Sequence, residues 1–389
     1  MLQRAQALRE RLIEIRRAIH RQPELGFQEL KTAQLVADTL TELGIEVETE
    51  VGLTGVVGHL GQEGPTIALR ADMDALPIQE LNDVPYASQV PGVMHACGHD
   101  AHVACLLGAA MLLAETELKG QVRFLFQPSE EGQDEEGKSG AVRMVEAGAM
   151  EGVDAVVALH THADTLAGTI GLLPGPMMAA ADTFNAVILG QACHGAYPHK
   201  GTDAIVMAAQ VIVAIQTILS RRIRPLDSGV VTVGTIQGGT KTNIVTDRVE
   251  LAGTIRSFKS EIRQQLFDEL ERACGVARAL GGDYELKITP GYPVTANDKA
   301  LTEFVRQVGI DLLGPDKVSE AEAEMGAEDF SFLTACAPGC FFRLGAGFPG
   351  QEPRRGHNPY FDINEDALPV GAAVLAEVAR RYLDSRFKI

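Results

Sequence analysis

The chain has 389 residues, 46% of them hydrophobic and 22% charged, so it is long enough and apolar enough to fold as two globular domains. A formal net charge of -18 argues against nucleic acid or an anionic membrane surface as a partner. No stretch approaches the unbroken apolar length of a membrane span, and residues 1–20 predict an amphipathic charged helix rather than a signal peptide. We therefore expect a cytoplasmic protein.

The first half of the chain alternates helical patterns with short apolar strands. Two helices are expected at 3–22 and 27–43, with Pro23 and Gly26 between them. Strands are expected at 55–61, 66–72, 121–128, 155–160 and 340–346, with helices such as 102–115 between them and a last helix at about 365–384. This pattern predicts an α/β domain whose central sheet has helices on both faces.

The pattern changes between residues 182 and 293. A strand at 183–190 is followed by a helix at 202–222, strands at 229–237 and 248–257, a helix at 260–280 and a strand at 284–291. This is the ferredoxin-like α+β order. We predict that 182–293 form an inserted domain, and that 1–181 and 294–389 form the larger metal-binding domain.

The stretch "MHACGHDAH", residues 94–102, is unusually rich in metal-capable side chains. Cys97 and His99 stand two residues apart, close enough to reach one cation, and small residues around them allow the loop to turn. A buried thiol beside surface histidines explains this stretch equally well. The choice depends on whether acidic partners lie elsewhere in the chain.

Such partners follow the predicted strands. Asp72 and Asp74 come after one strand, Glu130 and Glu131 after the next, and His160 ends a third. The carboxyl ends of strands are where an open α/β sheet presents its active site. Taken singly, these residues also suit a solvated charge pair, a strand cap or a core histidine, and a lone loop histidine such as His357 is often a surface residue. Together the chain offers enough N, S and O ligands for two ions, with Glu130 to spare: Cys97, His99, Glu131, His160 and His357.

At this point the chain resembles a family. The stretches "HRQPELGFQE", "LRADMDALPI", "MHACGHDAH", "QPSEEG", "MMAAADTF", "HGAYPH", "GTIRSF", "GAEDFS" and "HNPYFDINEDAL" occur in the order typical of M20 metallopeptidases, in their amidohydrolase subgroup. That subgroup includes hippurate hydrolases and indole-acetyl-amino-acid hydrolases. The resemblance implies hydrolysis of N-acyl-amino acids by a metal-activated water with Glu130 as general base.

The resemblance also implies a ligand set. Cys97 would bridge two divalent ions, expected to be zinc with manganese, cobalt or nickel as alternatives, and His99, Glu131, His160 and His357 would complete the two sites. The chain departs from the His-x-Asp motif of many M20 enzymes, because Asp72 stands where that histidine is expected. His99 would replace it, and Asp74 and Asp100 would orient the imidazoles.

The predicted inserted domain supplies the remaining candidates. His194 is expected to donate to the developing oxyanion, with His199 a second choice, although both also suit a turn around Pro198. Asn243 and Arg256 are expected to bind the substrate carboxylate, and a structural ion pair is the alternative for Arg256.

Two other functions stay open: a carboxypeptidase or dipeptidase that cleaves peptide bonds, and a catalytically silent metal-binding protein. The retention of both Glu130 and Glu131 argues against the silent protein, because binding alone needs no spare base. The helix at 204–219 is apolar on more than one face. With the family resemblance, this predicts a homodimer, or a higher homo-oligomer, in which His194 acts on the partner's metal site.

Overall fold

The computed structural model describes residues 1–384, which form two compact units. The first contains residues 1–175, 296–322 and 329–384, and the second contains 176–295 and 323–328. The predicted inserted domain, 182–293, lies within the second unit, which also takes in a few residues on either side and the short segment 323–328. The last five residues of the predicted range 294–389 lie outside the described part of the chain.

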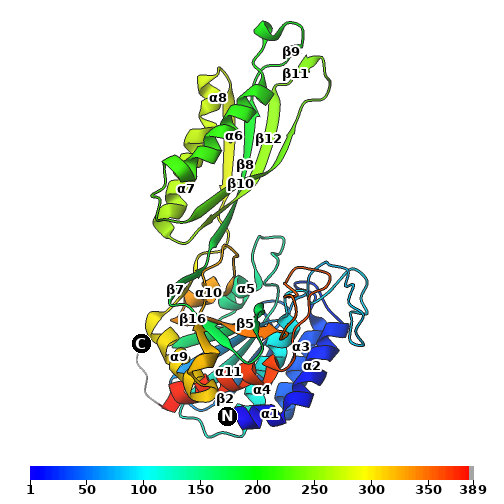
Figure 1. Ribbon diagram of the computed structural model, residues 1–389, viewed down its shortest axis with the longest axis vertical. Coiled ribbons are helices and arrows are strands. Elements are labelled where there is room, and N and C mark those ends of the chain that lie inside the picture. The colour runs from blue at the N-terminus through cyan, green and yellow to red at the C-terminus, as the bar shows by residue number, and fades with distance from the viewer. Residues whose placement is uncertain (385–389) are drawn as a thin grey trace. The chain divides into compact units, whose positions relative to one another are not determined.

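The first unit is built on an eight-stranded mixed sheet (Figure 1). Its strands lie in the order β1 (Glu46–Val51), β2 (Gly55–Gly61), β4 (Gln121–Gln127), β3 (Thr66–Asp72), β5 (Ala155–Leu166), β16 (Gly339–Gly347), β6 (Ile170–Leu172) and β15 (Val318–Glu320). The central strands β4, β3, β5 and β16 run parallel to one another. Every residue of β3 and β16 is buried, as expected where helices cover both faces of a parallel sheet.

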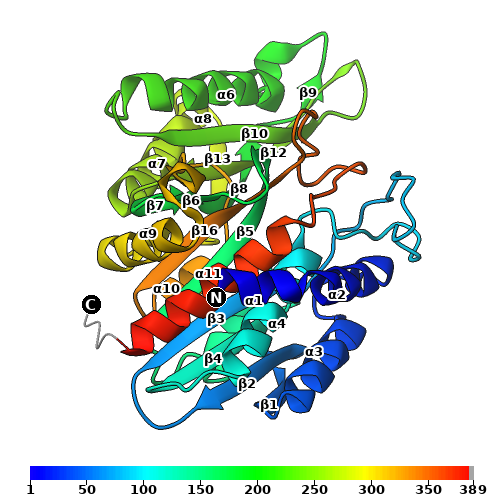
Figure 2. The same cartoon turned by 60° about the horizontal axis from the view of Figure 1, so that its bottom comes forward.

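Helices cover the two faces of this sheet unequally. One face carries α1 (Leu2–Ala7), α2 (Arg9–Arg21), α3 (Leu30–Glu42), α4 (His99–Ala114), α9 (Lys299–Leu313) and α11 (Ala367–Asp384), and the other carries α5 (Gly140–Glu146) and α10 (Phe330–Thr334) (Figures 1 and 2). Helix α4 is almost wholly buried against α2 and α11. A Cβ on Gly108 would lie 2.8 Å from both Ala372 and Leu12, so this glycine permits the close packing.

Several element boundaries differ from the sequence expectation for local backbone reasons. The helix expected at 3–22 is broken at Leu8, and α3 begins at Leu30 instead of residue 27 because Phe27 has a left-handed φ of 59°. Helix α4 begins at His99, which places the end of the metal-capable stretch in its first turn. Strand β1 was not expected, because its sequence is charged and mostly exposed. Helix α9 was not expected either.

The second unit contains a four-stranded antiparallel sheet. Its strands lie in the order β10 (Gly229–Gly238), β12 (Arg248–Ser257), β8 (Ala180–Leu189) and β13 (Asp283–Thr289), with α6 (Ala204–Arg221), α7 (Ser260–Cys274) and α8 (Val276–Ala279) packed against it. The chain order of these elements is the strand-helix-strand-strand-helix-strand order expected from the sequence. A short pair within this unit joins β9 (Cys193–His194) to β11 (Ile244–Val245). A second short pair joins β7 (Gly175–Met178) to β14 (Thr295–Asn297), and each of these two strands has residues in both units.

Helix α6 differs from the expectation that no stretch of the chain resembles a membrane span. Among the helices in residues 1–384 it alone has the length and apolar composition of a membrane span, although no such segment was expected. A single helix of this kind does not by itself indicate a membrane protein, because the core helix of a globular protein can have the same length and apolar composition. Its buried residues, among them Met207, Val211 and Ile215, form one face that packs on the sheet, whereas Ile205, Val206 and Val213 are about half exposed.

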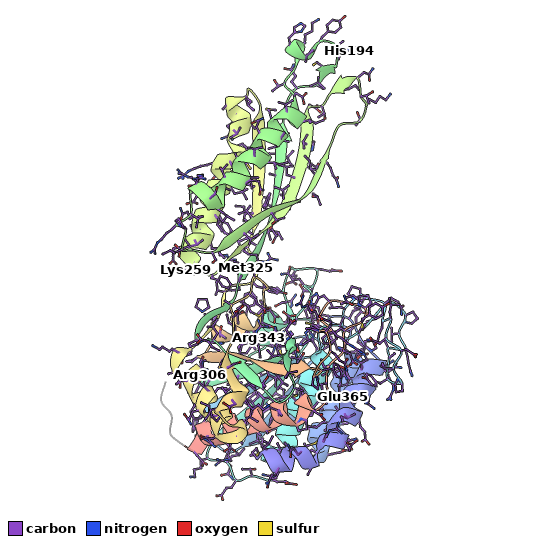
Figure 3. All side chains as sticks on the ribbon, viewed as in Figure 1. His194, Lys259, Arg306, Met325, Arg343 and Glu365 are labelled. Carbon is purple, nitrogen blue, oxygen red and sulfur yellow. The ribbon has the colours of Figure 1, made fainter. Side chains whose placement is uncertain are left out.

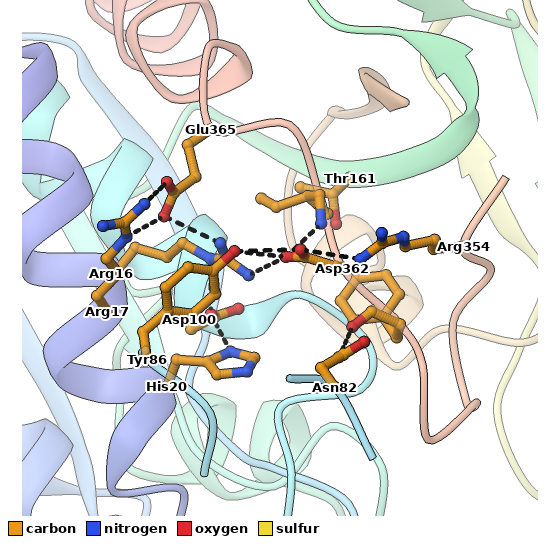
Figure 4. A network of polar contacts seen from close by, with 12 residues as sticks. Arg16, Arg17, His20, Asn82, Tyr86, Asp100, Thr161, Arg354, Asp362 and Glu365 are labelled. Atoms are coloured by element: carbon orange, nitrogen blue, oxygen red, sulfur yellow. Dashed lines mark hydrogen bonds and ion pairs between the residues drawn. The ribbon is translucent and has the colours of Figure 1, made fainter. Parts of the chain in front are cut away.

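A buried polar network joins α2 to the start of α4 (Figure 4). The Arg16 guanidinium donates to Asp100 at 2.9 Å, to Asp362 at 3.3 Å and to Glu365 at 3.0 Å. The His20 ring lies between two carboxylates, with Nδ1 2.7 Å from Asp100 and Nε2 3.3 Å from Glu80. Because each charge has an opposite partner, the network offsets the cost of burying these groups.

His20 is expected to make stability depend on pH. Burial lowers its pKa, but Asp100 and Glu80 outweigh this and raise the pKa to about 9 from the ordinary value of 6.5. Protonated His20 therefore stabilises the fold fully below about pH 6.5, and this contribution, roughly 3 kcal/mol, is lost as the pH rises to 9. In urea unfolding, the free-energy difference between wild type and His20→Gln should shrink over this range. A constant difference would contradict the assignment.

Candidate metal centre

The candidate metal centre lies at the carboxyl ends of the parallel strands of the first unit. Asp72 is the last residue of β3, Glu130 and Glu131 follow β4, and His160 lies within β5. Cys97 and His99 are brought to this edge by Gly98, whose φ of +90° turns the chain into α4. A Cβ on Gly98 would lie 2.3 Å from the Thr161 hydroxyl, so only glycine fits there without a shift.

The five predicted ligands form two groups that share one residue. Donor atoms of Cys97, His99 and His160 lie within 4.8 Å of one another, and so do those of Cys97, Glu131 and His357. Cys97 Sγ is 3.4 Å from His160 Nε2, and His357 Nε2 is 3.0 Å from Glu131 Oε1. Two ions could therefore share the thiolate. Glu130 joins His99 and Glu131 in a third such group, so it lies beside the candidate ligands.

Hydrogen bonds to backbone oxygens fix the Nδ1 atoms of two candidate ligand imidazoles. His99 Nδ1 donates to the backbone oxygen of Asp74 at 2.9 Å, and His160 Nδ1 donates to that of Thr161 at 2.8 Å. His99 Nε2 is buried and has no hydrogen-bond partner in the described part of the chain. An orphaned imidazole nitrogen beside a thiol and carboxylates fits a divalent ion well.

Asp74 and Asp100 differ in what they contact. The Asp74 carboxylate lies 3.2 Å from His99 Nδ1 and accepts the backbone N–H groups of Glu130 and Glu131, each at 3.0 Å. It thus links a candidate ligand to the loop that carries the candidate base. Asp100 instead binds Arg16 and His20, so the expectation that it contacts a ligand imidazole was wrong. As the second residue of α4, it points toward α2.

The sequence analysis assigned no role to His102. Its Nδ1 donates to Asp72 at 2.6 Å, and its Nε2 accepts the N–H of Thr161 at 3.0 Å. Because Thr161 in turn accepts from His160, His102 supports the orientation of that ring. The sequence could have indicated this role, because His102 follows His99 by three residues and therefore lies on the same face of a helix.

Arg70, on strand β3, is buried between the carboxylates of Asp72 and Asp329. It donates to Asp72 at 2.6 Å and to Asp329 at 3.0 Å. Burial alone would raise the pKa of Asp72, but Arg70 and the neighbouring imidazoles hold it well below its usual value. For Asp329 burial prevails, so its pKa is raised.

Protons compete with a metal for this donor set. Burial raises the pKa of the Cys97 thiol to about 12. Burial lowers the pKa of His99, but Asp72 and Cys97 raise it well above its ordinary value. The hydrogen bond to Glu131 raises the pKa of His357, whereas burial and His102 hold that of His160 well below the usual range. Metal binding must therefore displace protons.

The remaining candidates lie in the second unit. His194 is exposed on β9 (Figure 3), opposite Ile244 of β11, and the N–H of Gly195 donates to the backbone oxygen of Asn243 at 2.7 Å. His194 and Asn243 are thus neighbours, and His199 follows in the short 3-10 turn Pro198–Lys200.

Arg256 lies on β12, where it is partly buried. Its guanidinium donates to the Thr254 hydroxyl and to the backbone oxygen of Ile255, and burial lowers its pKa. Both of these acceptors are neutral oxygens, so these two hydrogen bonds do not form the structural ion pair that was the alternative role for Arg256.

An α/β sheet that gathers a thiol, imidazoles and carboxylates at its carboxyl edge is the arrangement of a metal-dependent hydrolase. Residues 68–381 match the model of peptidase family M20/M25/M40, and the chain belongs to this family. The predicted family is therefore confirmed, and with it the enzyme class, hydrolysis of amide bonds.

Curated relatives and solved structures agree with this membership. The chain is 42% identical over 381 residues to IAA-amino acid hydrolase ILR1-like 4 of Arabidopsis thaliana, covering 96% of this chain and 86% of that protein. It is 42% identical over 386 residues to N-acetyl-L-cysteine deacetylase of Bacillus subtilis, covering 97% and 89%. A dinuclear metal-binding peptidase of the M20 family from Bacillus subtilis superposes with a TM-score of 0.86 at 38% identity, over 98% and 99% of the two chains.

Proposed function

We propose that the protein hydrolyses the amide bond of N-acyl-amino acids with two divalent ions held by the five candidate ligands. The observation that carries this proposal is the pair of donor groups that share Cys97, with the Glu130 carboxylate beside them. The names of two relatives, an IAA-amino acid hydrolase and an N-acetyl-L-cysteine deacetylase, support an acyl-amino acid as substrate. The proposed compartment is the cytoplasm, on the sequence grounds given above.

The donor set suits zinc, because a thiolate and imidazoles are ligands that zinc prefers, and manganese, cobalt and nickel are alternatives. Divalent ions held by these ligands would supply Lewis acidity for the scissile carbonyl and for an attacking water. The chain's own groups then handle the protons and the substrate.

Glu130 is the proposed general base. It is 6% exposed, Asp74 accepts its backbone N–H, and its carboxylate lies close to donor atoms of His99 and Glu131. It takes a proton from the attacking water and returns it to the leaving nitrogen. We assign oxyanion stabilisation to His194, and recognition of the substrate carboxylate to Asn243 and Arg256.

A substrate panel tests this function. Purified protein should turn over N-acetyl- and N-benzoyl-amino acids faster than dipeptides of the same amino acid, and a chelator should abolish both activities. Faster cleavage of dipeptides would favour the carboxypeptidase or dipeptidase reading. A protein that binds metal and turns over neither class would favour the catalytically silent one.

The second unit is the proposed dimerisation domain. Helix α6 exposes Ile205, Val206 and Val213, and the edge strand β10 exposes Ile236. An unpaired strand edge beside an apolar helix face suits a two-fold contact with a second copy. His194 would then serve the partner's metal centre.

Subunit mixing tests this role of His194. Glu130→Gln and His194→Ala are each expected to be inactive, but hybrids formed after verified exchange should contain one intact site. Activity should therefore rise well above that of either parent. If no activity returns, or if a monomeric protein is fully active, His194 does not act across a dimer.

A further inference from the structure

The loop that carries Glu130 has an unusual backbone conformation. Strand β4 ends at Gln127, and Ser129, directly before Glu130, has a φ of +38°. A non-glycine residue is strained there and stays in this conformation only when its surroundings impose it. Groups around Ser129 must therefore impose this conformation.

Two segments of the chain hold the Ser129 backbone by hydrogen bonds, one containing Glu29 and the other Gly140. The Ser129 N–H donates to Glu29 Oε1 at 2.8 Å, and its carbonyl oxygen accepts the N–H of Gly140 at 2.9 Å. A Cβ on Gly26 would lie 2.3 Å from Ser129 Oγ, so this glycine leaves room for the side chain. Gly26 and Glu29 both belong to "HRQPELGFQE", a stretch to which the proposed function assigns no role.

Among the contacts of Ser129 described above, Glu29 provides the side chain that accepts a hydrogen bond from the Ser129 backbone. It is 0% exposed and immediately precedes α3, and its second oxygen accepts the Thr54 hydroxyl at 2.5 Å. Burial raises its pKa to about 7, while the bonds from Thr54 and Ser129 oppose that rise. Burying a carboxylate against neutral donors is costly, so a geometric requirement is a better explanation than stability.

We propose that Glu29 is a positioning residue for Glu130: its carboxylate holds the strained Ser129 backbone and thereby aims the Glu130 side chain. The inference rests on the proposed role of Glu130 as general base. Asp74 also holds this loop, but it contacts His99 as well, so its loss would disturb a candidate ligand at the same time. The contacts of Glu29 described above avoid the five candidate ligands, which separates alignment of the base from metal binding.

Three substitutions of Glu29 and one control separate the alternatives. Glu29→Met removes both hydrogen bonds at similar volume, and Glu29→Asp keeps the charge but withdraws it by one methylene. Glu29→Gln is the conservative variant, because its amide oxygen can accept from Ser129 while its NH2 donates to the Thr54 oxygen. Thr32→Val is the control, since it removes a hydrogen bond to Glu24 from the first turn of α3.

With an N-acetyl-amino acid as substrate, Glu29→Met and Glu29→Asp should lower kcat at least about tenfold, the scale expected for a misplaced catalytic group. KM and the affinity for added Zn²⁺ should stay within about twofold of wild type. Glu29→Gln should recover kcat to within roughly threefold, and Thr32→Val should match wild type. Hydrogen exchange of the peptide covering 128–132 should speed up in the Met and Asp variants alone. If Glu29→Met does not fold, Glu29→Asp carries the test.

The inference is overturned if the Met and Asp variants match Thr32→Val in kcat and exchange, or if they lose Zn²⁺ together with activity. Failure of the proposed function looks different. In that case Glu130→Gln keeps wild-type turnover while exchange at 128–132 still responds to Glu29.

Discussion

Glu130→Gln should abolish hydrolysis while the metal content stays at the wild-type value. The substitution removes the base but keeps the shape of the side chain, and its backbone N–H can still donate to Asp74. If Glu130 carries general-base catalysis, the loss should be at least about a hundredfold in kcat, which corresponds to ~2.7 kcal/mol of transition-state stabilisation. Steady-state kinetics and metal analysis of the same sample give the two numbers.

The neighbouring residue is the matched control. Glu131→Gln makes the same chemical change one residue along, but in a side chain 3.0 Å from His357. It should lower metal occupancy as well as rate. Wild-type turnover in metal-loaded Glu130→Gln would refute the base assignment, and unchanged metal content in the Glu131 variant would suggest that the two roles are exchanged.

Cys97→Ser should lose metal at both positions of the centre. Both donor groups include the Cys97 sulfur, so an alcohol in place of the thiolate weakens each of them. His160 and His357 occur in one group each, so alanine at either should deplete one position more than the other. Equilibrium dialysis with Zn²⁺ measures the number of ions bound per chain.

Cys105→Ala is the control for Cys97, because Cys105 lies on α4 with its Sγ near the Leu368 carbonyl oxygen. It should bind as many ions as wild type. If Cys97→Ser still binds two ions with wild-type affinity, the thiolate bridges nothing and the ligand assignment fails.

Much of the first unit was predictable from sequence because its parallel strands are continuous apolar runs. Strands β3, β4 and β16 fall almost where expected, since buried strands need apolar residues on both faces. The placement of Glu130 and His160 at one sheet edge followed from the same pattern. Strand β1 was not found, because its charged and largely exposed sequence lacks an apolar face.

Features set by single backbone angles or by distant partners were not predictable. The later start of α3 depends on the positive φ of Phe27, and the Glu130 loop depends on that of Ser129, neither of which is a glycine. The same holds for Asp100, whose partner Arg16 is 84 residues away in the chain. No local pattern indicates which buried cation an aspartate at a helix start will meet.

Titration of metal-free protein with Zn²⁺ tests the central claim most directly. The chelated protein should be inactive toward an N-acetyl-amino acid, and activity should return as Zn²⁺ fills a stoichiometry of about two ions per chain, with protons released to the buffer on binding. Full activity in protein from which metal analysis finds essentially no divalent ion would contradict the account.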